Sequence, residues 1–167
     1  LAATYSKSRF TGFDASDEAI GLANRTAREE GLENVVFERR DVASLEDRAT
    51  FDLVTAFDAI HDQAKPADVL AGIERVLRPG GRFLMQEIAG SSHVDQDCDH
   101  PIGTFLYTVS CMHCMTVSLS DGGAGLGAMW GSETASRMLE EAGFRNVQFD
   151  SLPHDVINHY YTAEKAD

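Results

Sequence analysis

Several acidic residues come directly after apolar segments that are typical of β-strands. Asp14 ends the segment RFTGFD, Asp41 follows NVVFERR, and Asp58 follows FDLVTAF. In nucleotide-binding α/β domains, a carboxylate at the end of a strand can accept hydrogen bonds from both hydroxyl groups of a ribose. Asp14 is the first candidate for this role. The alternative is that Asp14 only caps the helix that begins after it.

A second nucleotide contact is predicted at Asp41 and Val42. The carboxylate could accept the exocyclic amine of an adenine while the valine packs on the base. The alternative is an exposed turn residue, because a single acid after a strand is a common feature.

The segment FDAIHD follows the apolar strand pattern that ends at Phe57, and it carries Asp58, His61 and Asp62. Reacting groups in α/β folds lie at the carboxyl ends of strands. An unperturbed histidine titrates near neutral pH, so His61 could accept a proton from a substrate. The alternative is a histidine that hydrogen-bonds the loop backbone.

A cluster of cysteine and histidine lies further along, in the segment CMHC at Cys111–Cys114, with His93, Cys98 and His100 upstream. Zinc binding and a redox pair are two interpretations of the C-x-x-C spacing. The spacing has no matching second pair, and on a helix both cysteines would share one face with Tyr107. We therefore predict buried packing there and no metal.

Strand-like and helix-like segments alternate along most of the chain. Strands are expected at residues 9–14, 34–38, 51–57 and 82–88, and helices begin near Asp17, Pro66 and Ser132. This alternation predicts an α/β, Rossmann-like fold with a mainly parallel sheet and helices on both faces. The segments 146–150 and 159–164 are expected to form an antiparallel strand pair at the C-terminal end.

The segment 90–131 interrupts this alternation, and we predict that it is a lid that shapes an acceptor site. It contains the glycine-rich sequence GAGLG at Gly123–Gly127. If Met115–Leu119 were a strand, this sequence could be a nucleotide-binding loop in a permuted site. A flexible loop over the active site is the favoured interpretation.

The composition limits the class of protein and of partner. A chain of 167 residues with 43% hydrophobic residues fits one globular domain, 1–167. The net charge of −13 disfavours nucleic acid and anionic membrane surfaces as partners. No segment approaches the roughly 18 apolar residues that a membrane helix needs. Three cysteines, an odd number, favour a reducing, cytoplasmic compartment.

The order of FDAS, NVVFERRDV, FDLVTAFDAIHD and VLRPGGRFLMQE resembles the class I S-adenosylmethionine-dependent methyltransferases. The segments CMHCMTVSL and GGAGLGAMWG resemble a bacterial subgroup of that family. The resemblance implies S-adenosylmethionine as cofactor. It assigns the ribose to Asp14 with Ala15 and Ser16 beside it, the adenine to Asp41 and Val42, and the methionine part to Phe57 and Asp58.

For the reaction, the resemblance implies transfer of a methyl group to a small-molecule acceptor. The candidate catalytic residues are His61 and His113, which would accept a proton where the acceptor must lose one. A non-catalytic module that senses S-adenosylmethionine or another nucleotide, or that dimerises, is one alternative. A nicotinamide-dependent enzyme is another. A homodimer is compatible with the sequence.

The first strand and glycine-rich loop of that family have no counterpart in the sequence. Residues 1–8 (LAATYSKS) are interpreted as the remainder of the helix that follows this loop. We therefore expect an N-terminally incomplete domain, which on its own would bind the cofactor weakly or not at all. Glycine is needed in that loop because its backbone approaches the cofactor closely.

Overall fold

The computed structural model describes residues 1–166, and they form two compact units that are described separately. Residues 1–45 make the first unit, and the second begins at Glu46. Within the described residues, no helix is both long enough and apolar enough to cross a bilayer.

The first unit is a β-α-β arrangement. Strands β1 (Phe10–Asp14) and β2 (Val35–Arg39) pair in parallel, and α1 (Asp17–Glu29) connects them. The Ser16 hydroxyl accepts a hydrogen bond from the backbone N–H of Ala19 at 3.2 Å, so Ser16 is the N-cap that its residue type predicts. A short 3₁₀ helix, η1 (Val42–Ser44), follows β2.

Residues 1–8 do not form the helix that the sequence analysis expects. They make a series of turns, and the side-chain amide of Asn34 donates to the carbonyl oxygens of Ala2, Tyr5 and Ser8 at 3.0–3.2 Å. The expected helix is replaced because one side chain from outside the segment binds three of its carbonyl groups.

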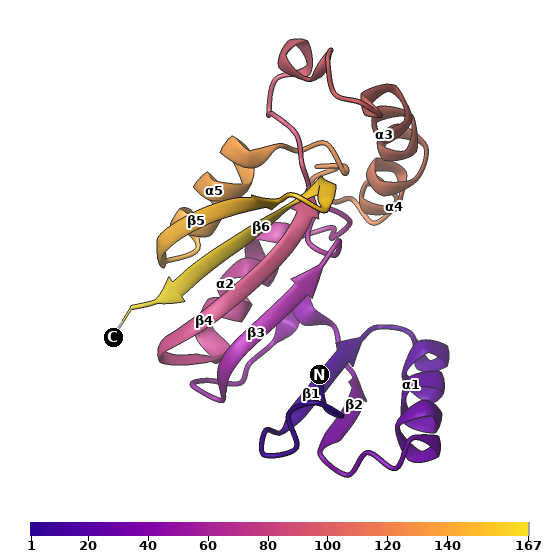
Figure 1. Ribbon diagram of the computed structural model, residues 1–167, viewed down its shortest axis with the longest axis vertical. Helices are drawn as coiled ribbons and strands as arrows, with labels where there is room; N and C mark the ends of the chain where they lie inside the picture. The colour runs from indigo at the N-terminus through magenta and orange to yellow at the C-terminus, as the bar shows by residue number, and fades with distance from the viewer. Residues whose placement is uncertain (167) are drawn as a thin grey trace. The chain divides into compact units, whose positions relative to one another are not determined.

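The second unit is built on a four-stranded sheet in the order β3-β4-β6-β5 (Figure 1). Strands β3 (Phe51–Phe57) and β4 (Leu77–Ile88) are parallel. Strand β6 (Asp155–Lys165) runs antiparallel to β4 and to β5 (Phe144–Leu152). The α/β class and the C-terminal antiparallel pair are confirmed. The strand pairing of the chain is mixed.

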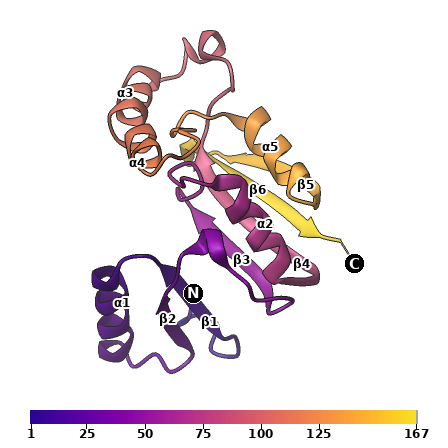
Figure 2. The same cartoon turned by 180° about the vertical axis from the view of Figure 1, so that it is seen from behind.

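Helices α2 (Pro66–Val76) and α5 (Ser132–Glu141) cover one face of this sheet, as Figure 2 shows. Proline begins α2, where its missing N–H costs no helical hydrogen bond. Helix α2 buries an apolar stripe, in which Val69, Leu70, Ile73 and Val76 are at most 5% exposed. Under the helices, the rings of Phe83 and Phe144 stack at 5.6 Å.

The segment 90–131 is largely helical. It contains the 3₁₀ helix η2 (Val94–Asp97), then α3 (Gly103–Val109), the π-helical turn η3 (Ser110–Cys114) and α4 (Met115–Ser120). Helices α3 and α4 lie beyond the carboxyl ends of β3 and β4 (Figure 1). Because Met115–Leu119 is helical, the alternative of a strand leading into a glycine-rich nucleotide loop is wrong.

Candidate functional site

In the first unit, the predicted ribose-binding residues lie in the turn between β1 and α1. Asp14, Ala15 and Ser16 are all exposed. One oxygen of Asp14, Oδ1, accepts the backbone N–H of Ser16 at 2.7 Å. Ser16, and not Asp14, caps α1. The turn holds the Asp14 carboxylate in place, and the helix does not use it as a cap.

The predicted adenine-binding residues lie in the corresponding turn after β2. Asp41 is exposed and its Oδ1 accepts the backbone N–H of Ala43 at 2.9 Å, which begins η1. Val42 is half-buried beside it. The two parallel strands of this unit thus each end in a turn with an exposed carboxylate that accepts one local backbone N–H.

In the second unit, Phe57 and Asp58 lie at the carboxyl end of β3. Phe57 is 52% exposed, which is unusual for a large aromatic side chain. Asp58 has a φ of +47°, in the left-handed region, and its backbone N–H donates to the Gln86 carbonyl oxygen at 2.9 Å. Such a backbone conformation at the end of a strand is frequent in functional turns.

His61 is buried between two carboxylates. Its Nδ1 bonds Glu87 Oε2, and its Nε2 lies 3.2 Å from Asp62 Oδ1. The other oxygen of Glu87 accepts the backbone N–H of Ile60 at 3.0 Å. Burial opposes a charge on the ring, but the hydrogen bond and charge of Glu87 and the charge of Asp62 raise the pKa of His61. His61 is therefore an oriented ring, held at Nδ1 by Glu87 and with Nε2 facing the Asp62 carboxylate.

His113 is exposed on the π-helical turn η3, and the cysteines on either side of it differ in environment. Cys114 is buried, whereas Cys111 is exposed. The expectation that both pack on one buried face is therefore wrong for Cys111. Burial and a hydrogen bond to Asp62 raise the pKa of the Cys114 thiol to about 11. The predicted catalytic roles of His61 and His113 stay predictions.

The helical segment is anchored to the loop that follows β3. The hydroxyl of buried Ser118 donates to the Gln63 carbonyl oxygen at 2.9 Å and accepts the backbone N–H of Gly125 at 3.0 Å. The Ala124 N–H donates to the Ala64 carbonyl oxygen at 3.0 Å. The glycine-rich sequence is thus tied down by hydrogen bonds to α4 and to this loop.

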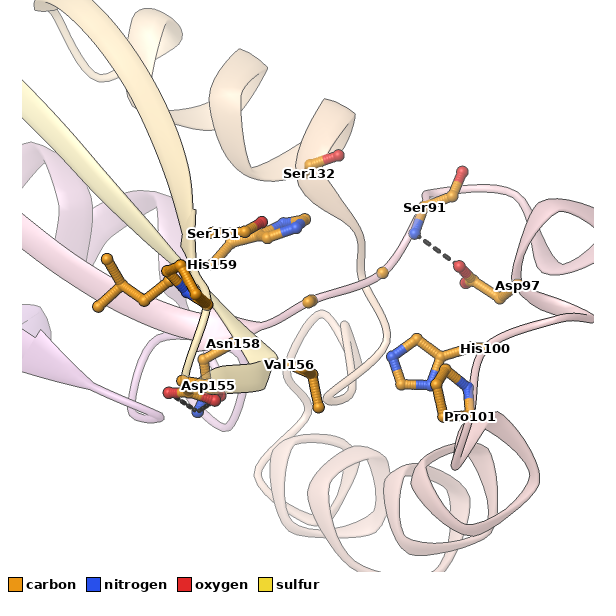
Figure 3. A pocket seen from close by; sticks show the side chains of 14 residues that line it. Ser91, Asp97, His100, Pro101, Ser132, Ser151, Asp155, Val156, Asn158 and His159 are labelled. Atoms are coloured by element: carbon orange, nitrogen blue, oxygen red, sulfur yellow. Dashed lines mark hydrogen bonds between the residues drawn. The ribbon is translucent and has the colours of Figure 1, made fainter.

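A cavity of about 550 Å³ opens beside the carboxyl end of β4 (Figure 3). Its walls come from four places: the residues after β4, the connection between η2 and α3, the start of α5, and the β5–β6 turn. His100 and His159 lie on opposite walls. Two acids of the wall are already bonded, since Asp97 binds the Ser91 N–H and Asp155 binds Asn158 and Tyr160.

Three buried polar atoms on the walls of this cavity have no hydrogen-bond partner among the described residues. They are His100 Nε2, Asn158 Oδ1 and His159 Nδ1. Burial lowers the pKa of His159, although the charge of Glu133 acts in the opposite direction, so the surroundings favour the neutral ring. Unpaired buried polar atoms are rare, and a cavity that gathers three of them is a candidate ligand site.

The sequence analysis missed this cavity and its neighbour Glu87. Glu87 and His159 are register partners on β4 and β6, so the cavity wall adjoins the strand residue that holds His61. His100 lies far in sequence from Asn158 and His159, which are neighbours on β6. In the sequence, only polar residues within otherwise apolar strand patterns, such as Glu87 in RFLMQEI, could have indicated a buried polar site here.

Comparison with known proteins identifies the family. The sequence model of a methyltransferase domain matches residues 1–143. The chain belongs to the class I S-adenosylmethionine-dependent methyltransferases. This methyltransferase chain is 26% identical over 155 residues to the S-adenosyl-L-methionine-dependent Diels-Alderase iccD of Talaromyces variabilis, covering 89% of this chain and 50% of that protein.

Solved structures share the methyltransferase fold. The YcgJ protein from Bacillus subtilis has a TM-score of 0.70 at 15% identity, covering 99% of this chain and 87% of that one. The trans-methyltransferase CalH, in complex with SAH, has a TM-score of 0.68 at 22% identity, covering 95% and 43%. The chain spans half or less of the length of the curated relatives that it matches.

Proposed function

We propose that the protein transfers a methyl group from S-adenosylmethionine to a small-molecule acceptor that binds in the cavity beside β4. The observation that carries the choice of acceptor site is the set of three unpartnered polar atoms on the cavity walls. A volume of about 550 Å³ lies in the usual range for small-molecule sites.

The chemistry of the turn residues fits the cofactor. Ribose hydroxyls and the adenine amine are hydrogen-bond donors, and the exposed carboxylates of Asp14 and Asp41 are acceptors. We assign Asp14, with Ala15 and Ser16, to the ribose, and Asp41 with Val42 to the adenine. The exposed ring of Phe57 and the strained Asp58 are assigned to the methionine part.

When bound, S-adenosylmethionine supplies a methyl group that its sulfonium already activates. The residues of the cavity then have two tasks, to orient the acceptor and to remove its proton where it carries one. The side-chain oxygen of Asn158, Oδ1, can accept a hydrogen bond from the acceptor. The His159 ring, whose neutral form burial favours, can take the proton at Nδ1, whereas Nδ1 of His61 is bonded to Glu87 and its Nε2 faces Asp62.

The negative charge of the chain supports a small molecule as the acceptor. With a net charge of −13, the chain repels polyanions, so a nucleic acid is a poor acceptor. A second function is favoured by one relative, whose name describes an S-adenosyl-L-methionine-dependent Diels-Alderase. A protein that binds the cofactor without consuming it, including a sensing module, is therefore the alternative.

The test is turnover across a panel of small acceptors. The full-length protein is incubated with S-adenosylmethionine and hydroxyl, amine and thiol compounds, and S-adenosylhomocysteine is measured. For the acceptor that responds, His159→Ala should lower kcat/KM about tenfold or more, because an orienting and proton-accepting group is lost. His154→Ala, an exposed histidine in the same β5–β6 turn, is the control.

Two results would contradict the proposal. Cofactor binding with no S-adenosylhomocysteine from any acceptor would favour the non-methylating alternative. Equal effects of His159→Ala and His154→Ala would place the acceptor elsewhere than in this cavity.

A further inference from the structure

A set of metal-binding side chains converges where η3 packs against the loop after β3. One ligand atom from each of His61, Asp62 and Cys114 lies within 4.8 Å of the others. They supply an imidazole nitrogen, a carboxylate oxygen and a sulfur, which together form a ligand set that zinc accepts. His61 and Cys114 are buried, and Asp62 is partly accessible at 32% side-chain exposure.

The distance between the nitrogen and oxygen ligands fits a tetrahedral ion. The His61 Nε2 and Asp62 Oδ1 atoms are 3.2 Å apart. Two ligands at about 2.0 Å from a tetrahedral zinc ion lie about 3.3 Å from each other. Asp62 Oδ1 is also buried. It faces His61 Nε2 but has no hydrogen bond of normal geometry among the described residues, so a cation between the two atoms would satisfy it.

A fourth residue, Glu87, orients the His61 ring in the way that is common around metal-binding histidines. Histidine ligands usually donate their other ring N–H to a carboxylate, which fixes the ring and its tautomer. Glu87 is the carboxylate that accepts from Nδ1 of His61, and its second oxygen accepts the Ile60 N–H. Both oxygens of the buried Glu87 are already bonded, to His61 and to the Ile60 N–H, so we assign it to positioning, although with Asp58 and His61 it forms a second group of metal-ligating atoms.

We propose that His61 Nε2, Asp62 and Cys114 Sγ bind one divalent transition-metal ion of the zinc type, with Glu87 as the residue that positions His61. Coordination replaces the thiol proton of Cys114, which leaves to solvent. A three-residue set leaves a fourth position for water or another ligand, on the side where Asp62 is accessible. The ion would join η3 to the loop after β3.

This set differs from the one that the C-x-x-C spacing suggests. Among the described residues, no cluster with metal-binding geometry includes His93, Cys98, His100 or Cys111. The π-helical turn places Cys114 toward the core and leaves Cys111 exposed. The same sequence signal therefore contributes one cysteine to the proposed site, and its partners come from the FDAIHD segment.

The test is cobalt substitution in the full-length protein, measured without cofactor or acceptor, so it is independent of the proposed methyl transfer. After treatment with a chelator, Co²⁺ is titrated into the wild type. We expect one equivalent to give thiolate-to-cobalt charge-transfer absorption and the strong visible bands of a tetrahedral ion, and Zn²⁺ to remove both. Metal analysis of the purified protein should find zinc.

Matched variants locate the site. Cys114→Ser should abolish the charge-transfer band, and Asp62→Asn should weaken Co²⁺ binding by more than about tenfold. The double variant Cys98→Ser/Cys111→Ser, at two exposed cysteines, should keep the band. Circular dichroism confirms that each variant is folded. No thiolate band in the folded wild type, or a band that depends on Cys98 or Cys111, would overturn the proposal.

Discussion

Glu133 holds the first turn of α5 against the loop that follows β4. Its Oε2 accepts the Ser92 backbone N–H at 2.8 Å, and the Ser92 hydroxyl accepts the Thr134 N–H at 2.9 Å. The N–H groups of Ser92 and of Glu133 itself hold the pKa of the Glu133 carboxyl at about 2, below its ordinary value. This carboxylate therefore stabilises the wall of the cavity only while it is ionised.

The sign of the pH dependence follows from the lowered pKa. The stabilisation is complete above the ordinary glutamate pKa and is lost as the pH falls toward 2. Glu133→Gln should lower the free energy of unfolding at pH 7, by no more than about 1 kcal/mol because the side chain is exposed. Urea unfolding at pH 7 and at pH 3 measures the difference, which should shrink at the lower pH.

Glu140→Gln is the control for this pH prediction, since Glu140 is an exposed acid on the same helix. An equal loss of stability from both substitutions, or a difference that does not change with pH, would show that the Ser92 contact contributes nothing.

Single residues were predictable where their role is local. Ser16 as a helix cap, and the position of Asp14 and Asp41 after strands, follow from residue type and neighbours. Glu87 was not identified, because its partners His61 and Ile60 lie 26 and 27 residues away in the chain. Contacts of this kind depend on the strand register, which no local pattern encodes.

Among the elements, the helical segment that spans α3, η3 and α4 depends on Ser118. This residue is 1% exposed, and its hydroxyl makes one hydrogen bond to the loop after β3 and one to the glycine-rich segment. Removing the hydroxyl leaves the partly buried Gln63 carbonyl oxygen and Gly125 N–H without their partner. Such groups cost about 1–3 kcal/mol each when they lose a hydrogen bond.

Ser118→Ala should therefore loosen this segment selectively. Amide hydrogen exchange should speed up in residues 103–127 and stay unchanged in β4 and β6. Ser120→Ala is the matched control, since Ser120 is exposed on the same helix and its hydroxyl bonds only Val117 within it. Unchanged exchange in Ser118→Ala would contradict the anchoring role.

The elements also show where sequence patterns stop being informative. The helices α1, α2 and α5 and most strands were predicted within a few residues, because their apolar periodicity and their capping, proline and glycine signals agree. Strand β4 is the exception, because it begins at Leu77 and not at residue 82. The segment Met115–Leu119 is short and apolar enough to fit a strand or a helix. The segment is helical in the structure, where it continues directly from α3 through a π-helical turn.

For the whole molecule, family and fold agree on a methyltransferase. The family match over residues 1–143 and the shared fold of solved structures identify the class. Neither of them identifies the residues that hold the cofactor. We propose that exposed strand-end carboxylates, above all Asp14, bind S-adenosylmethionine.

The most direct test is calorimetric titration of the full-length protein with S-adenosylmethionine. Loss of a carboxylate that accepts two ribose hydroxyls removes about 1.5–3 kcal/mol, so Asp14→Ala should raise Kd roughly tenfold to a hundredfold. Glu18→Ala, an exposed acid in the first turn of α1, should leave Kd unchanged. Wild-type affinity in a folded Asp14→Ala variant would contradict the account.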